Sequence, residues 1–159
     1  MRRTTAVALL VGMVFVAVPR IAATQNAPAV YKPGLADLMT MTVQPRHIKL
    51  AIAGRARNWI YANYELAELG DALARAAALW PKYKGLPIDG MVDAFAKGPM
   101  RQVSVAIADK DPAGFAAAFG QLAVGCNACH QAANVGHVVI KTPALPDAQM
   151  FPDQEFGPP

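Results

Sequence analysis

Cysteine is scarce in this chain of 159 residues, which has two, at positions 126 and 129. Both fall in one short motif, so no thiol is left for a disulfide elsewhere. The sequence also lacks a run of lysine and arginine interleaved with aromatic residues, which argues against a nucleic-acid-binding surface. It has no internal repeat, and about 136 residues follow its apolar N-terminal segment. That length suffices for one hydrophobic core but not for two ordinary domains.

The N-terminal segment has the composition of a secretory signal peptide. Arg2 and Arg3 form a short positive start, the following run from residue 6 to 18 is apolar, and Ala22–Ala23 offers small residues for cleavage. The apolar run is about 13 residues long, whereas a membrane-spanning helix needs about 20. We therefore expect residues 1–23 to be removed and the protein to be periplasmic, with an uncleaved membrane anchor as the alternative. Cleavage would lower the net charge to about +1.

Four stretches rich in alanine and leucine alternate with clusters of proline, glycine, asparagine and aspartate. They predict helices over residues 35–53, 58–80, 87–108 and 112–135. Pro45 and Pro99 fall inside two of these helices and are expected to kink or restart them. Apolar residues spaced by three and four give the second and fourth helices one buried seam each. The expected fold is all-α, an antiparallel four-helix bundle with short connections.

The segments outside the predicted helices are expected to be irregular. Residues 24–34 are predicted to form a flexible N-terminal segment, called the lead below, and residues 35–140 to form the helical domain. The tail over residues 141–159 is rich in proline and carries Asp147, Asp153 and Glu155, so we expect it to be extended or disordered.

The two cysteines belong to the pentapeptide Cys126-Asn127-Ala128-Cys129-His130, near the end of the fourth predicted helix. This spacing is the attachment signature of a c-type haem. On a helix the thiols lie about one turn apart on one face, where they can form thioethers with two vinyl groups of one porphyrin. His130 can then supply the proximal iron ligand. A redox-active dithiol or a structural disulfide is the alternative. The single motif predicts one covalent haem c, with its iron, per chain.

The second axial position of the iron has three candidate occupants. His47 shares the inner, apolar face of the first predicted helix with Val43 and Leu50, so we propose it as the distal ligand. Met39 is the better placed of two methionines in that helix, because Met41 lies on another face. The third alternative leaves the iron five-coordinate, in which case His47 is an ordinary core residue.

A signal peptide, four helices and a CxxCH motif near the end of the last helix resemble the class II c-type cytochromes, the cytochrome c-prime group. The segments from Gln44 to Leu50 and from Asn58 to Leu66 resemble a subgroup of exported bacterial cytochrome-like proteins. The likeness spans essentially the mature chain. It implies a four-helix bundle around one haem, with either a methionine of the first helix or no residue opposite the proximal histidine.

The expected function is electron transfer through Fe(III)/Fe(II) cycling between exported or membrane-bound redox partner proteins. It needs no catalytic residue, so we do not expect an enzyme. A five-coordinate protein that binds NO or CO is the alternative. Nucleic acid is not an expected partner, contact with a membrane would come only from a retained signal segment, and the chain can act alone or as a homodimer.

Overall fold

The computed structural model describes residues 31–144 and 150–159. The chain divides into two units, Met1–Tyr31 and Lys32–Pro159, of which the second holds every helix and strand described below. The predicted signal peptide and most of the predicted lead over residues 24–34 lie outside the described residues.

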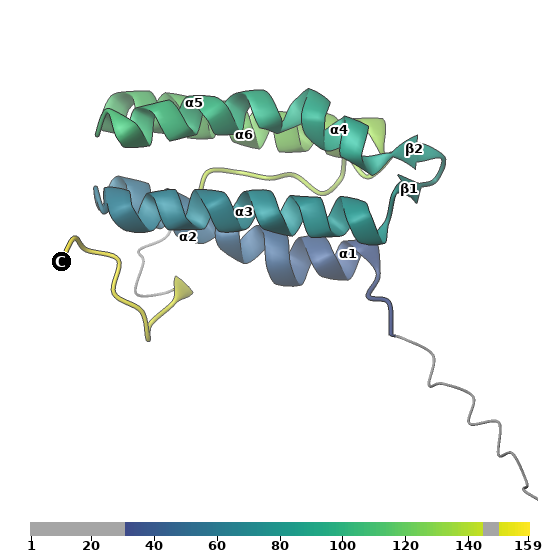
Figure 1. Ribbon diagram of the computed structural model, residues 1–159, viewed down its shortest axis with the longest axis horizontal. Coiled ribbons are helices and arrows are strands. Elements are labelled where there is room, and N and C mark those ends of the chain that lie inside the picture. Colours follow the sequence, from purple (N-terminus) through teal and green to yellow (C-terminus); the bar gives the residue numbers. More distant parts are fainter. Residues whose placement is uncertain (1–30, 145–149) are drawn as a thin grey trace, which may run out of the picture. The chain divides into compact units, whose positions relative to one another are not determined.

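The second unit is all-α apart from one short hairpin, which confirms the expected class (Figure 1). Its elements are α1 (Leu35–Leu38), the π-helical η1 (Met39–Val43), α2 (Gln44–Arg55), α3 (Trp59–Leu79), β1 (Lys82–Tyr83), β2 (Leu86–Pro87), α4 (Ile88–Phe95), α5 (Lys97–Ala108) and α6 (Pro112–Ala132). The strands pair antiparallel in the register Lys82↔Pro87 and Tyr83↔Leu86. Within the described residues no helix is both long and apolar enough to cross a bilayer.

The first predicted helix is one continuous helical segment with a change of winding before Pro45. Leu38 and Gln44, which flank η1, both have right-handed helical backbone angles, so α1, η1 and α2 follow one another without a loop. Pro45 has no N–H to donate and its ring would meet the carbonyl one turn earlier, so the wider π turn before it relieves the conflict. Pro45 was expected to kink or restart its helix, and the structure shows a π-helical turn before it, with α2 beginning at Gln44.

The third predicted helix, over residues 87–108, consists of two helices that meet at Ala96, which confirms the expectation that Pro99 kinks or restarts it. α4 ends at Phe95, Ala96 has a φ of −106°, and α5 begins at Lys97. Pro99 lies in the first turn of α5 and cannot donate a hydrogen bond to the Phe95 carbonyl, so the helix restarts just before it.

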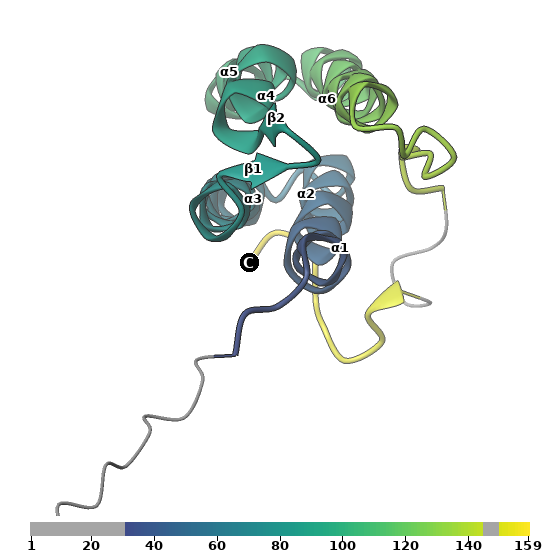
Figure 2. The same cartoon turned by 90° about the vertical axis from the view of Figure 1, so that its right-hand side faces the viewer.

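The helices lie side by side around a common core. α2 packs against α3, α5 against α6, and α6 also against α2 and α4. Seen end-on, the α2, α3, α4–α5 and α6 segments surround this core (Figure 2). Its fully buried apolar side chains include Leu50, Ile52, Val103, Phe119 and Leu122.

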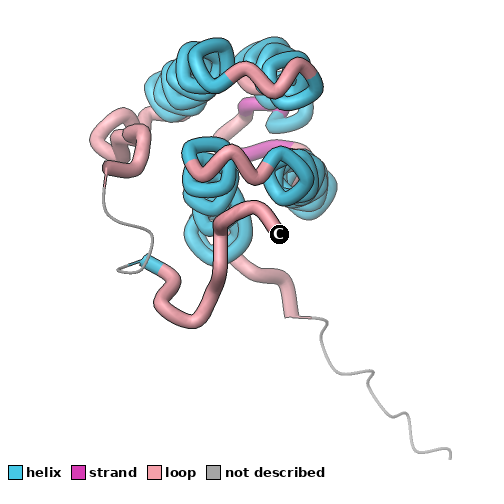
Figure 3. Tube along the Cα trace, turned by 90° about the vertical axis from the view of Figure 1, so that its left-hand side faces the viewer, coloured by secondary structure: helices cyan, strands magenta, loops and turns pink. Residues whose placement is uncertain are grey.

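Residues 150–159, part of the tail that was expected to be extended or disordered, have little regular structure but pack against α2 and α3 (Figure 3). Phe156 is only 3% exposed and belongs to the main core. The Asn58 side chain donates to the Gly157 carbonyl at 2.7 Å, and Gln154 donates to the Tyr61 hydroxyl. Burial of aromatic side chains stabilises this segment on the helices, although its prolines prevent regular secondary structure.

Candidate haem-attachment site

The two thiols lie in the last turns of α6 and face the interior. Both are free, and both are partly buried. Cys126 packs against the main core, whereas Cys129 packs against a smaller apolar cluster formed by Ile88, Met91 and Ala133. As the spacing predicts, the helix presents both sulfur atoms to the space between helices rather than to solvent.

The electrostatic environment of these thiols is unlike that of a redox-active dithiol. Burial, together with the nearby Cys129, raises the pKa of Cys126 to about 11. Burial also raises the pKa of Cys129. Reactive CxxC thiols sit at helix N-termini, where their pKa falls and the thiolate forms. Here the motif lies near a helix C-terminus and both thiols stay protonated at neutral pH, so the alternative of a redox dithiol is not favoured.

The His130 imidazole is held in one tautomer by the chain that follows α6. Its Nδ1 atom lies 2.6 Å from the Val138 carbonyl oxygen. A carbonyl can only accept, so Nδ1 carries the proton and the lone pair resides on Nε2. This is the arrangement typical of a metal-binding histidine, in which one ring nitrogen donates to the protein and the other binds the metal.

Asn127, between the two cysteines, fixes the returning segment against α6. Its side chain donates to the Ile140 carbonyl at 2.9 Å and accepts from the Ile140 amide at 2.7 Å. The segment after α6 therefore doubles back along the helix, as the light green loop shows (Figure 1). Sequence reasoning missed this role, because an asparagine inside a CxxCH motif carries no spacing signal of its own.

Gly125 brings the start of the motif into contact with the break between α4 and α5. A Cβ atom added at Gly125 would lie 2.1 Å from the Phe95 carbonyl oxygen. Only a residue without a side chain lets the α6 backbone approach this closely. The position of Cys126, the next residue, is thus set by helix–helix contact.

His47 is buried on the face of α2 that meets α6. It is 6% exposed, and its Nε2 atom is buried without a hydrogen-bond partner among the described residues. Burial lowers its pKa to about 4, so the ring is neutral at physiological pH. A neutral imidazole with an unpartnered nitrogen has the chemistry of an iron ligand.

The level of His47 along α6 differs from that of the CxxCH motif. Its ring packs against Phe119, and a Cβ atom added at Gly54 would meet the ring of Phe115, so α2 runs antiparallel to α6. Phe119 precedes His130 by eleven residues, roughly 16 Å along the helix axis. At this separation His47 and His130 would hold one iron together only if α2 were shifted along α6. Its role as distal ligand stays a prediction that this geometry does not favour.

Met39 lies closer to the level of the motif. Leu35, one turn before it, packs against the same apolar cluster as Cys129. Met39 is partly buried and begins the π-helical segment, whereas Met41 is 76% exposed, as expected for a different face. π-Helical turns occur often at functional sites.

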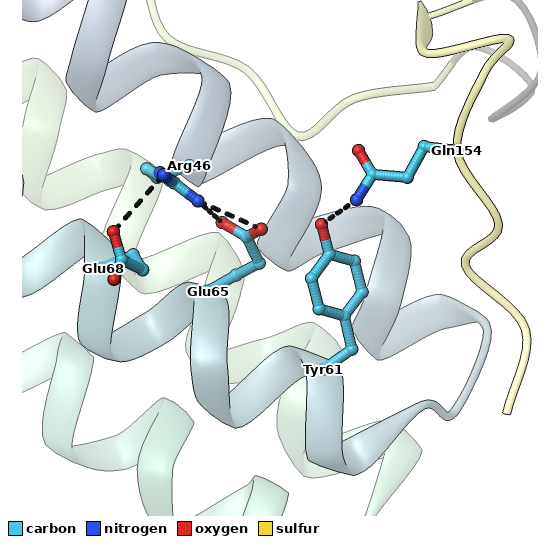
Figure 4. A network of polar contacts seen from close by, with 5 residues as sticks. All are labelled: Arg46, Tyr61, Glu65, Glu68 and Gln154. Carbon is cyan, nitrogen blue, oxygen red and sulfur yellow. Dashed lines mark hydrogen bonds and ion pairs between the residues drawn. The ribbon is translucent and has the colours of Figure 1, made fainter. Parts of the chain in front are cut away.

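Arg46, next to His47, faces α3 and fixes the rotation of α2 (Figure 4). Its guanidinium lies 3.2 Å from the carboxylate of Glu65, which is 1% exposed, and 3.3 Å from that of Glu68. Neighbouring residues on a helix point about 100° apart. With Arg46 held by α3, His47 is directed toward α6, so the two do not form a distal acid–base pair.

No cluster of three or more His, Cys, Asp or Glu side chains suited to a metal ion occurs within residues 31–144 and 150–159. Comparisons of the chain with protein-family models, curated proteins and solved structures give no match.

Proposed function

We propose that this chain is an exported monohaem c-type cytochrome that transfers electrons, built as an antiparallel four-helix bundle of the class II kind. The observation that carries the proposal is the set of donors near the end of α6. Two free thiols one turn apart face the interior, and the imidazole that follows has its lone pair on the nitrogen away from Val138. These donors suit a covalently attached haem better than a disulfide exchange site.

Each residue of the motif has a definite role in this proposal. Cys126 and Cys129 would hold the porphyrin by adding their S–H groups across its two vinyl groups, and His130 would bind the iron through Nε2. When bound, haem supplies the one-electron Fe(III)/Fe(II) couple. The apolar cluster beside Cys129 excludes water from the attachment edge, and Gly125 fixes where that edge lies.

The first helical segment would supply the distal side. The levels described above favour Met39 over His47, because Met39 lies one turn from a residue that shares the cluster of Cys129. Met39 and His130 would then hold the iron as a thioether and an imidazole, a ligand pair that raises the reduction potential and would suit electron transfer. The partners would then be redox proteins of the same compartment, with export supported by the N-terminal sequence.

The second candidate function is binding of NO or CO at a five-coordinate iron. Its support is the apolar character of the cluster next to Cys129, in which Ile88 and Ala133 carry no atom that binds iron. An open distal face would leave the role of Met39 to packing.

Optical spectra of the purified holo-protein separate the two functions. We expect a low-spin ferric spectrum with a methionine-to-iron charge-transfer band and slow reaction of the reduced form with CO. A high-spin ferric spectrum with rapid CO uptake would replace electron transfer by gas binding as the proposed function.

A further inference from the structure

We propose that Asn127 is a positioning residue for the proximal ligand, and that it tunes the reduction potential of the haem through the hydrogen bond of His130. This inference rests on the proposed function. It assigns a role to the first of the two residues between the cysteines, which the haem-attachment signature itself leaves unspecified.

The contact between Asn127 and the returning chain is unusually complete for a single side chain. The amide group both donates to the carbonyl and accepts from the N–H of one residue, Ile140, at 2.9 and 2.7 Å. Both backbone groups of Ile140 are thereby satisfied by the helix, as they would be by a neighbouring strand. A side chain with only a donor or only an acceptor cannot reproduce this pairing.

The returning segment has further contacts near the turn that follows α6. At its start the chain turns at Asn134, which has a φ of 56°, and the Val135 amide donates to the His130 carbonyl at 2.9 Å. Val138 and Val139 are 47% and 59% exposed, so burial of their side chains contributes little to the position of this segment. The Val138 amide also donates to the Val135 carbonyl at 2.9 Å. Beyond Ile140 the Arg55 guanidinium donates to the Pro143 carbonyl, so Asn127 is the anchor nearest to Val138 on the far side of the turn.

The Val138 carbonyl, two residues before Ile140, is the acceptor for His130 Nδ1 at 2.6 Å. A hydrogen bond donated by the outer nitrogen makes an imidazole a stronger electron donor through the other nitrogen. A stronger donor stabilises the ferric state, so the bond lowers the reduction potential. By holding Ile140, Asn127 keeps the Val138 carbonyl in place.

The test compares Asn127→Ala with Gln121→Ala in the full-length holo-protein. Gln121 is an exposed amide on the same helix, which makes it a matched control. For Asn127→Ala we expect covalent haem to be retained and the midpoint potential to rise. The expected change is about a tenfold higher reduced-to-oxidised ratio at a fixed ambient potential, which equals about 59 mV for one electron. Solvent exchange of the His130 ring N–H, followed by NMR in the reduced protein, should accelerate about tenfold or more as the bond to Val138 loosens.

Asn127→Asp provides a second variant, which serves alone if Asn127→Ala does not fold. It keeps an acceptor for the Ile140 amide, loses the donor and adds a negative charge that itself lowers the potential, so its readout is the exchange of the His130 ring N–H, which should be faster than in the wild type. Unchanged potential and unchanged ring N–H exchange in a variant that carries covalent haem would overturn the role of Asn127. Absence of covalent haem from the wild type would instead refute the proposed function, so the two failures are distinguishable.

Discussion

The imidazole of His47 packs against the ring of Phe119, with centroids 4.5 Å apart and planes tilted by 38°. This contact joins α2 to α6 in the interior and buries a titratable group. It also places that group about two turns before the CxxCH motif along α6. The effect of His47 on the stability of the fold can therefore be measured separately from any role of His47 as an iron ligand.

The burial of His47 predicts a loss of stability in acid. Its pKa is about 4 in the folded protein and about 6.5 when unfolded, so the unfolded chain binds the proton first as pH falls. The stabilisation is fully present above pH 6.5 and is lost progressively down to pH 4, by about 3 kcal/mol. Urea denaturation at pH 7, 5.5 and 4 measures it. His47→Leu should remove most of this slope, and a slope as steep in that variant would assign it to other groups.

The buried carboxylate of Glu65 predicts a second stability effect. Glu65→Gln leaves Arg46 with only the Glu68 carboxylate, which is 28% exposed, and should lower the free energy of unfolding by about 2 kcal/mol. The matched control is Glu68→Gln, which removes the more exposed partner and should cost less than about 1 kcal/mol. Denaturant melts of both variants test the ranking. Equal losses of unfolding free energy would show that the burial of Glu65 does not strengthen its ion pair with Arg46.

Two glycines of α6 predict opposite outcomes for the same substitution. Gly125→Ala would place a methyl group 2.1 Å from the Phe95 carbonyl and should destabilise the protein by more than about 2 kcal/mol. We also expect it to lower the yield of covalent haem, because it displaces Cys126. Gly120→Ala meets nothing within 4 Å and should stabilise by about 0.5–1 kcal/mol. Thermal melts and haem stain of both variants decide whether the close approach at Gly125 exists.

The distal side can be assigned by paired variants of the first helical segment. Met39→Ala should convert a low-spin ferric spectrum to a high-spin one, remove the methionine-to-iron charge-transfer band and accelerate CO binding to the reduced protein. His47→Ala should leave the spin state unchanged, because His47 lies at the level of Phe119. The reverse pattern would restore His47 as the ligand and would imply that α2 moves along α6 when haem binds.

The starts of two helices were predictable because a side chain caps each one. Asn58 accepts from the Tyr61 amide at the start of α3, and Asp111 accepts from the Ala113 amide at the start of α6. Asparagine and aspartate are both strong N-caps, so the sequence alone predicts where these two helices begin. The inward direction of Cys126 and Cys129 follows equally from helical periodicity.

Features that depend on contacts between distant segments could not be read in advance. The restart before Pro99 was expected from the proline itself, but the docking of Phe156 in the main core depends on contacts between segments far apart in the sequence. The pairing of Asn127 with Ile140 spans a turn whose geometry is set by Asn134. Periodicity also placed His47 on the correct face but gave no information about its level along α6, which depends on how the helices align.

Covalent attachment of haem through Cys126 and Cys129 is the central claim, and retention of haem by the denatured polypeptide tests it most directly. The full chain is expressed in a host that matures c-type cytochromes, purified, denatured and extracted with acidified organic solvent. We predict that wild-type polypeptide keeps one haem per chain, and that the double variant Cys126→Ala with Cys129→Ala keeps none. Release of the haem from the wild type into the solvent, or its absence from the purified protein, would contradict the account.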